Sequence, residues 1–259
     1  MAQGTDSQQT TVSPGPKDFK PQHMPLSRLG APAEGEVHAW FLDLGLLGAP
    51  LRQALAGESP DSGAALTAGQ RRFARRFYLR LLLGAYLGLS GKDVSLVRSV
   101  KGKPVLDAAV HQTGLQFSMA KSGDKVLVGV CSFNPIGVDL EPADRRAHNA
   151  MRVARRYFHP DEADDLTAMP AAGRDAAFVR AWACKEAVVK ASGQGIANQL
   201  CRFRIEMSPD RPAAIHAMEG DDAEGWALTL LRPEAGFVGA VAVQHPRLEL
   251  HCHRLLPAA

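Results

Sequence analysis

The sequence predicts an α+β fold made of two halves of similar size, divided near residue 133. The chain has 259 residues, and 46% of them are hydrophobic, which is enough for one large core or two small ones. Strand-like and helical patterns occur in the first half and recur in a similar order in the second half. We therefore expect two α+β halves with an active site in the crevice between them.

The first half begins with a segment that we expect to lie outside the fold. Residues 1–34 are rich in Gln, Thr, Ser, Pro and Gly and have almost no apolar periodicity, which is typical of a flexible arm. The rest of this half, residues 35–133, carries the predicted elements of a first subdomain. These are a strand at 37–44, a long helix at 67–87 that ends at Gly88, and short strands at 94–97, 115–119 and 126–131.

The second half, residues 134–259, has a similar order of predicted strands and helices. Its predicted elements are a strand at 136–141, helices at 149–158 and 174–192, and strands at 203–207, 226–230 and 237–243. The long helix is ended by Gly193 and Gly195.

Composition excludes several classes of protein. No uninterrupted apolar run approaches the roughly 20 residues that cross a bilayer, and the first residues lack the pattern of a signal peptide. We therefore expect a cytoplasmic protein without a membrane partner. The four cysteines show no CxxC spacing, so neither a disulfide framework nor a zinc site is predicted. His251 and His253 alternate at strand spacing, but two such residues without further ligands are more typical of a strand edge than of a metal site.

Charge argues against a nucleic-acid partner. The formal net charge is only +3, and the chain has three tyrosines and three tryptophans to interleave with its basic residues. The basic residues gather instead in two places that resemble anion sites. One is the predicted helix with Arg72, Arg76 and Arg80, where a merely solvated face is the alternative, and the other contains Arg98, Lys101 and Lys103.

Two acidic residues alternate with apolar ones in the predicted strand at 136–141. The period of two in a strand places Asp139 and Glu141 on one face. Oxygen ligands of this kind suit Mg²⁺, which usually takes one or two carboxylates and keeps several waters. An ordinary strand with a solvated acidic face is the alternative.

A helical ridge in the second half combines aromatic, acidic and basic side chains. Phe178, Trp182, Glu186 and Lys190 are spaced four residues apart and therefore share one face of the helix. The acid and the base could act in chemistry. A surface Glu–Lys pair beside a core tryptophan is the alternative.

Together these segments resemble the Sfp-type 4′-phosphopantetheinyl transferases. Residues 137–141 are similar to the family's G-[IV]-D-[IVL]-E segment, and 182–195 are similar to its W-x-x-K-E-[AS]-x-x-K-x-x-G-x-G motif, in the same order. Residues 158–162 resemble an F-[FH]-x-x-E-like stretch, and 98–104 resemble a GKP sequence preceded by basic residues. The resemblance covers residues 37–245.

The resemblance implies a fold, an activity and partners. The fold is that of the long, pseudo-dimeric class, a monomer with two α/β subdomains in pseudo-twofold arrangement. The activity is that of a holo-[acyl-carrier-protein] synthase: 4′-phosphopantetheine moves from coenzyme A to a serine hydroxyl of an apo acyl or peptidyl carrier protein, and adenosine 3′,5′-bisphosphate is released. A catalytically inactive, carrier-binding homologue is the alternative, but the presence of Asp139 and Glu186 argues against it.

The resemblance also implies roles for individual residues. Asp139, Glu141 and Glu186 would bind Mg²⁺, for which Mn²⁺ could substitute, and Lys190 would neutralise the coenzyme A pyrophosphate. Either Glu186 or a metal-bound hydroxide would take the serine proton, and Lys185 receives no role. The residues implied at coenzyme A are Arg76, Arg98, Lys101, Gly102, Lys103, Pro104, Lys121, Ser122 and Lys190.

One position departs from the family's pattern. Residues 117–123 align with F-N-x-S-H-[ST]-G, which puts Lys121 where the family often has histidine. A lysine can bind phosphate there but cannot supply a neutral imidazole.

A basic helix follows the acidic strand, and we expect its arginines, including Arg152 and Arg155, to dock an acidic carrier protein. A solvated helix with Tyr157 and Phe158 in the core is the alternative.

Overall fold

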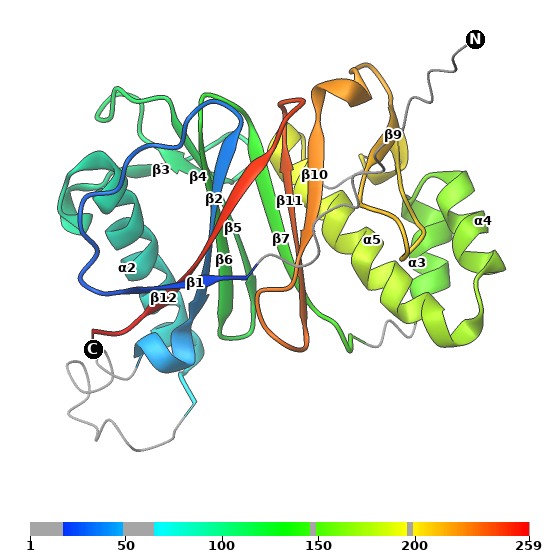
Figure 1. Ribbon diagram of the computed structural model, residues 1–259, viewed down its shortest axis with the longest axis horizontal. Coiled ribbons are helices and arrows are strands. Elements are labelled where there is room, and N and C mark those ends of the chain that lie inside the picture. Colours follow the sequence, from blue (N-terminus) through cyan, green and yellow to red (C-terminus); the bar gives the residue numbers. More distant parts are fainter. Residues whose placement is uncertain (1–17, 49–64, 146–148, 196–198, 259) are drawn as a thin grey trace, which may run out of the picture.

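The computed structural model describes residues 18–48, 65–145, 149–195 and 199–258, and it confirms the predicted α+β fold. Four layers follow one another across the molecule (Figure 1): a long helix, a five-stranded sheet, a three-stranded sheet and a second long helix. Each half therefore consists of one sheet covered by one long helix, as the two-subdomain prediction requires.

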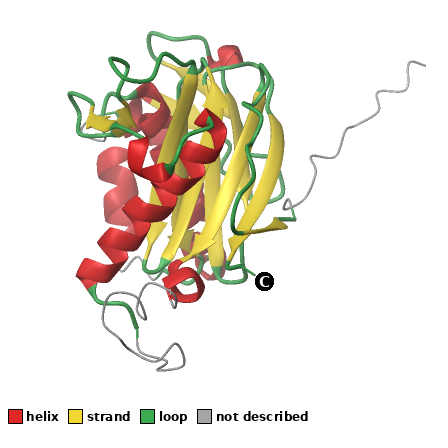
Figure 2. Ribbon diagram, turned by 90° about the vertical axis from the view of Figure 1, so that its left-hand side faces the viewer, coloured by secondary structure: helices red, strands yellow, loops and turns green. Residues whose placement is uncertain are grey.

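The first half is built on the five-stranded sheet. Its strand order is β1 (Lys20–His23), β12 (Glu249–Leu256), β2 (Glu36–Asp43), β6 (Lys125–Ser132) and β5 (Leu115–Ser122). Trp40 and Leu42 of β2 point toward helix α2 (Ala68–Leu87), and Tyr78 and Leu82 of the helix pack in the same cluster. Figure 2, seen from the α2 side, shows helices in front of the strands.

The ends of α2 agree with its sequence signals. Thr67 accepts a hydrogen bond from the Gln70 backbone N–H, and Gln70 accepts one from the Thr67 N–H, which makes a capping box. Gly88 closes the helix in the left-handed conformation, with φ of 68°. After it come η1 (Gly91–Asp93) and a hairpin of β3 (Leu96–Arg98) and β4 (Pro104–Leu106).

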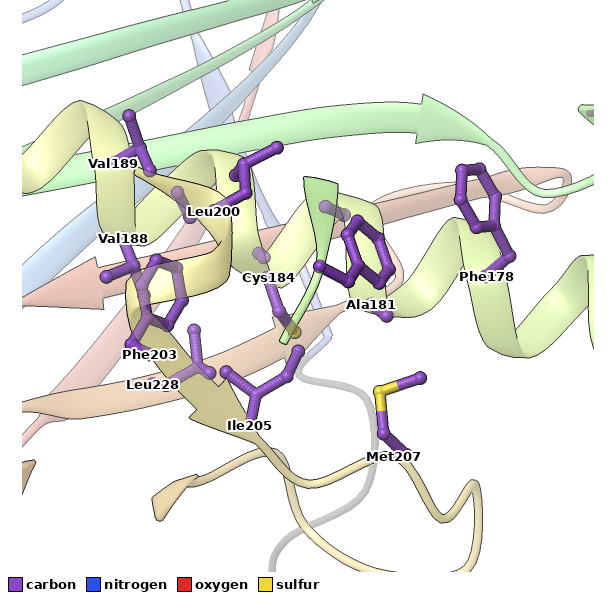
Figure 3. Close-up of a cluster of buried hydrophobic side chains, with 14 of the residues drawn as sticks. Phe178, Ala181, Cys184, Val188, Val189, Leu200, Phe203, Ile205, Met207 and Leu228 are labelled. Atoms are coloured by element: carbon purple, nitrogen blue, oxygen red, sulfur yellow. The ribbon is translucent and has the colours of Figure 1, made fainter. Parts of the chain in front are cut away.

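The second half is built on the antiparallel sheet β10 (Ala227–Leu231), β11 (Phe237–Val243) and β7 (Ile136–Pro142). Helix α5 (Ala171–Ser192) covers this sheet, with α3 (Ala150–Tyr157) and α4 (Pro160–Ala168) beside it. Figure 3 shows the core around α5, to which η2 (Leu200–Arg202) and β8 (Phe203–Ile205) contribute. Strand β8 pairs with β9 (Ile215–Met218), and η3 (Ala223–Gly225) precedes β10.

The two sheets meet face to face. Ala39 and Phe41 of β2 share a buried cluster with Val138 and Leu140 of β7. The edge strands β5 and β7 are also linked, because the Val138 N–H donates to Ser118 Oγ at 3.2 Å. The halves are thus held by a common core, and the acidic strand β7 lies at their junction.

Four of the described strands lie outside the ranges that the sequence predicted: the short strands β4 and β9, and the sheet strands β1 and β12. Strand β1 belongs to the sheet although residues 1–34 were expected to be a flexible arm, so at least Lys20–His23 are part of the fold. Strand β12, from the C-terminal end of the second half, lies between β1 and β2 in the first half's sheet. The boundary near residue 133 therefore does not separate two continuous segments. Within the described residues, no helix is long and apolar enough to span a membrane.

Candidate active site

Helix α5 lies unusually close to strand β7, and Gly137 makes this possible. A methyl group on Gly137 would overlap the carbonyl oxygen of Ala187 and lie 2.5 Å from the backbone nitrogen of Ala191. Only glycine permits this approach of helix to strand. Residues Gly137, Asp139 and Glu141 share the helix-facing side of β7, because Val138 and Leu140 point into the core between the sheets.

The close approach brings acids and a base together. Lys190 Nζ lies 2.6 Å from Asp139 Oδ1 and 3.3 Å from Glu186 Oε2, so both carboxylates converge on one ammonium. Asp139 and Glu186 are buried. Asp139 Oδ2 is buried too, and no group of the described residues donates a hydrogen bond to it. A buried carboxylate oxygen without a partner is costly, so this oxygen is suited to accept a cation.

Glu141 lies on the same side of β7 but is engaged elsewhere. Arg145 Nη1 lies 2.6 Å from Glu141 Oε1, and the Arg145 guanidinium stands 5.7 Å from the centre of the Trp182 ring. Among the described residues, Asp139, Glu141 and Glu186 do not offer three oxygens within 4.8 Å of one another. Asp139 and Glu186 therefore share Lys190, whereas Glu141 contacts Arg145. Sequence reasoning did not single out Arg145.

Burial controls the electrostatics of this cluster. Burial raises the pKa of Asp139 above its usual range, although Lys190 opposes the shift. The pKa of Glu141 is raised by burial and by the charge of Asp139, and burial likewise raises that of Glu186. Burial alone would lower the pKa of Lys190, but Asp139 and Glu186 outweigh it and raise that pKa. The acids gather charge that is incompletely neutralised, which favours a further cation.

Lys185 points away from this cluster, into the core on another side of α5. Its side chain is fully buried, and its Nζ lies 2.8 Å from Glu162 Oε2 and donates to the carbonyls of Leu200 and Phe203. Glu162, also fully buried, accepts from the Ile205 N–H through its other oxygen. The pair thus ties α4, α5 and β8 together. The sequence motif marked both residues, but it did not reveal that they are partners.

Lys103 connects the hairpin of the first half to the backbone of β7 and α5 in the second. Its Nζ donates to the carbonyl oxygens of Ile136 at 2.7 Å and Lys190 at 3.0 Å. Burial lowers the pKa of Lys103 to about 8, and nearby Lys190 acts in the same direction. Of the residues predicted at coenzyme A, Lys190 contacts the acids directly, and Lys103 contacts the backbone carbonyl of Lys190.

The other predicted basic residues are spread over the surface of the first half. Arg98 is exposed and donates to the carbonyl of Gly102, and Lys101 is exposed on the same β3–β4 loop, which Pro104 closes. Lys121 is exposed at the end of β5, and Ser122 beside it is partly buried. The structure brings none of these side chains into contact with Asp139 or Glu186 among the described residues.

Arg76 lines a separate hollow of about 730 Å³ between α2 and η1. Arg72, Arg80 and Lys92 line it as well. Phe73 and Phe77 are exposed there, with stacked rings whose centres are 6.2 Å apart. The hollow is thus both basic and aromatic, but none of the acid-cluster residues lines it.

Comparison with known proteins decides the family. The family model described as the 4′-phosphopantetheinyl transferase superfamily matches residues 135–242, a range that includes β7 and α5. The 4′-phosphopantetheinyl transferase HetI of Nostoc sp. is 35% identical over 214 residues, which cover 80% of this chain and 87% of the relative. The chain belongs to the 4′-phosphopantetheinyl transferase superfamily. The family and the transferase activity that the sequence predicted are therefore confirmed.

Two more distant relatives carry the same enzyme name. A 4′-phosphopantetheinyl transferase of Bacillus subtilis is 29% identical over 64% of this chain and 78% of its own. The transferase Sfp of Bacillus subtilis strain 168 is 26% identical over 68% of this chain and 81% of its own. The solved holo-[acyl-carrier-protein] synthase of Thermotoga maritima aligns over 44% of this chain and 64% of its own, with 20% identity and a TM-score of 0.33.

Proposed function

We propose that this transferase works with a Mg²⁺ ion bound by Asp139 and Glu186 and, directly or through water, by Glu141. The enzyme moves the 4′-phosphopantetheine arm of coenzyme A onto a serine of a carrier protein. The observation that supports the metal proposal is that Asp139 Oδ2 is buried and accepts no hydrogen bond from the described residues. Two further carboxylates, Glu141 on β7 and Glu186 on α5, lie in the same part of the fold. When bound, such an ion would neutralise phosphate charge and orient the pyrophosphate; Mn²⁺ could replace it.

The residues of the chain would position the reacting groups. Phosphoryl-type transfer depends mainly on alignment and on stabilisation of charge spread over phosphate oxygens. Lys190, which already bridges the two carboxylates, would neutralise the pyrophosphate and assist the departure of adenosine 3′,5′-bisphosphate. Glu186, which lies beside Lys190 on the same face of α5, would take the serine proton as general base.

The β3–β4 loop would hold the phosphates of coenzyme A. Lys103, the last residue of this loop, donates to the carbonyls of Ile136 and Lys190, so it would meet a phosphate bound near Lys190. Arg98 and Lys101 are exposed on the same loop and would reach the 3′-phosphate, with Lys121 and Arg76 as further cations. The acceptor serine would come from a carrier protein docked on α3, where Arg152 and Arg155 are exposed.

The packing of α3 supports part of this docking proposal. Tyr157 is 38% exposed, and the guanidinium of Arg156 stands over its ring. Phe158, in contrast, is buried and stacks on Phe178. For Phe158 the alternative interpretation, a core residue, is therefore the correct one. The basic side chains and Tyr157 are thus exposed to a partner, whereas Phe158 is structural.

We further propose that the enzyme is a cytoplasmic monomer.

One assay tests the proposed chemistry. Apo carrier protein is incubated with the enzyme, coenzyme A and Mg²⁺, and mass spectrometry measures the gain of the phosphopantetheine arm. Excess EDTA should abolish the gain, and added Mg²⁺ or Mn²⁺ should restore it. Undiminished transfer in excess chelator would refute the metal proposal while leaving the transferase activity intact. A panel of acyl and peptidyl carriers in the same assay would identify the preferred partner.

A further inference from the structure

A second group of possible metal ligands lies on the five-stranded sheet, away from the active site. Strands β2 and β12 are parallel neighbours, with Glu36 opposite Glu249 and His38 opposite His251. Residues two apart on a strand share a face, so these four side chains form a two-by-two array. Helix α2 covers the same face of the sheet at Trp40 and Leu42 of β2. Tyr86 of this helix forms a 2.7 Å hydrogen bond between its hydroxyl oxygen and His38 Nδ1.

Three of these side chains converge. His251 Nε2 lies 3.4 Å from Glu249 Oε1 and 4.0 Å from Glu36 Oε1. One ligand atom from each of the three lies within 4.8 Å of the other two. Glu36 is oriented by its second oxygen, which accepts a hydrogen bond from the Ala33 N–H at 2.8 Å, and this leaves Oε1 to face His251.

The array lacks a permanent positive charge. Two carboxylates directly opposite each other on neighbouring strands destabilise a sheet. Among the described residues, His251 is the only basic side chain within 4.0 Å of Glu36 or Glu249. Elsewhere in the same part of the fold, Glu234 is paired with both Lys125 and Arg254. The charge of the Glu36–Glu249 pair is therefore left for a partly exposed histidine or for an external cation to balance.

We propose that Glu36, Glu249 and His251 form a binding site for a divalent transition-metal ion of the zinc type. Ligands about 2.0–2.2 Å from a tetrahedral zinc ion lie roughly 3.3–3.6 Å from one another. The observed separation of His251 and Glu249 already agrees with this, and Glu36 requires a small rotation. One imidazole and two carboxylates are ligands that Zn²⁺ accepts, and water completes the fourth position. The sequence argued against metal at His251 because further ligands were missing; the fold supplies them from β2 and from Glu249.

The position of the site suggests a structural role. Strand β12 is the segment that returns from the second half to complete the sheet of the first. Glu249 and His251 are near its beginning, and Glu36 begins β2. A metal ion would tie the two strands together and hold the returning segment in register, independently of catalysis.

Zinc binding to the whole protein tests this inference. Isothermal titration with Zn²⁺, in excess Mg²⁺ to compete at the active site, should show a site that Glu249→Gln and His251→Gln each weaken at least about tenfold. Zinc at about a hundred times its dissociation constant should raise the melting temperature of the parent by about 5–10 °C. In EDTA both variants should stay folded, and in Mg²⁺ both should keep the parent's transferase activity, because Glu249 and His251 are 71% and 43% exposed and lie away from the active site.

A matched histidine provides the control. His216 Nε2 lies 3.4 Å from Glu206 Oε2, the same separation as in the His251–Glu249 pair, but among the described residues no second carboxylate completes a group of three with them. His216→Gln should bind zinc like the parent. The inference is overturned if zinc leaves the parent's melting temperature unchanged, or if His251→Gln and Glu249→Gln bind zinc as tightly as His216→Gln does.

Discussion

Lys190 Nζ lies 2.6 Å from Asp139 Oδ1, and this contact joins helix α5 to strand β7 at the centre of the candidate active site. The same nitrogen contacts Glu186 Oε2 at 3.3 Å. Two buried carboxylates, one on β7 and one on α5, thus share one ammonium. The contact gives a structural basis for assigning these three residues to one chemical unit.

Removing Asp139 should impair catalysis more than folding. Asp139→Ala removes Oδ2, the proposed metal ligand, and Oδ1, which contacts Lys190. We expect a loss of at least about 10²-fold in turnover, roughly 2.7 kcal/mol of barrier. Carrier modification followed by mass measures the rate, and circular dichroism confirms that the variant is folded. A loss of tenfold or less would show that Asp139 does not position the ion.

Gly137→Ala should separate α5 from β7. The added methyl group would overlap the carbonyl oxygen of Ala187, which belongs to backbone and cannot rotate away. We expect a destabilisation of about 1–3 kcal/mol or more, measured by urea denaturation, together with reduced turnover. Gly173→Ala, in the first turns of α5 where a methyl group meets nothing within 4 Å, is the control and should be neutral or slightly stabilising. Equal stability of the two variants would contradict the close-approach argument.

Lys185 should be important for stability. Lys185→Met leaves the Glu162 carboxylate buried without its partner, which costs about 3–5 kcal/mol in comparable buried pairs. Exchanging both residues, as Lys185→Met with Glu162→Gln, should recover part of the loss, because no buried charge then remains. Urea denaturation measures both variants, and the exposed Lys92→Met serves as the control. A single Lys185→Met variant as stable as the parent would show that the pair contributes nothing to the fold.

The affinity for coenzyme A should fall as the pH rises past about 8. Burial lowers the pKa of Lys103 to about 8, so its ammonium loses its proton there rather than near the usual value of 10.5. A neutral amine no longer attracts phosphate, and the dissociation constant should increase by up to about tenfold for each pH unit above that pKa. Lys103→Arg stays charged and should remove the dependence. Calorimetry from pH 7 to 10 provides the measurement, and identical profiles for parent and variant would exclude Lys103 from the phosphate site.

Reversing charge on α3 should weaken carrier docking alone. Arg152 and Arg155 are exposed, so replacing both by glutamate should leave the fold and coenzyme A binding unchanged. The KM for an acidic carrier protein should rise, and its dependence on salt should become weaker, because attractive charges are lost. Steady-state kinetics at two salt concentrations measure both effects. Carrier kinetics like those of the parent would place the docking face elsewhere.

Local patterns in the sequence predicted the long helices and most of the strands. The period of two placed Asp139 and Glu141 on one face of β7, and the period of four aligned Glu186 with Lys190 on α5. Gly88 and Gly193 marked the ends of the two long helices, where the structure has the left-handed conformation. These properties depend on neighbours in the chain, and a sequence displays its neighbours directly.

The tertiary structure decided which of these residues meet. No periodicity could show that Glu141 pairs with Arg145, that Lys185 turns into the core toward Glu162, or that Lys103 spans the junction to the Lys190 carbonyl. Nor could it place the last strand beside the first ones. That parallel pairing arises because the core between the two sheets must be closed, and it alone brings Glu249 and His251 to Glu36. Contacts between distant parts of a chain follow from the packing of whole layers, which no local pattern records.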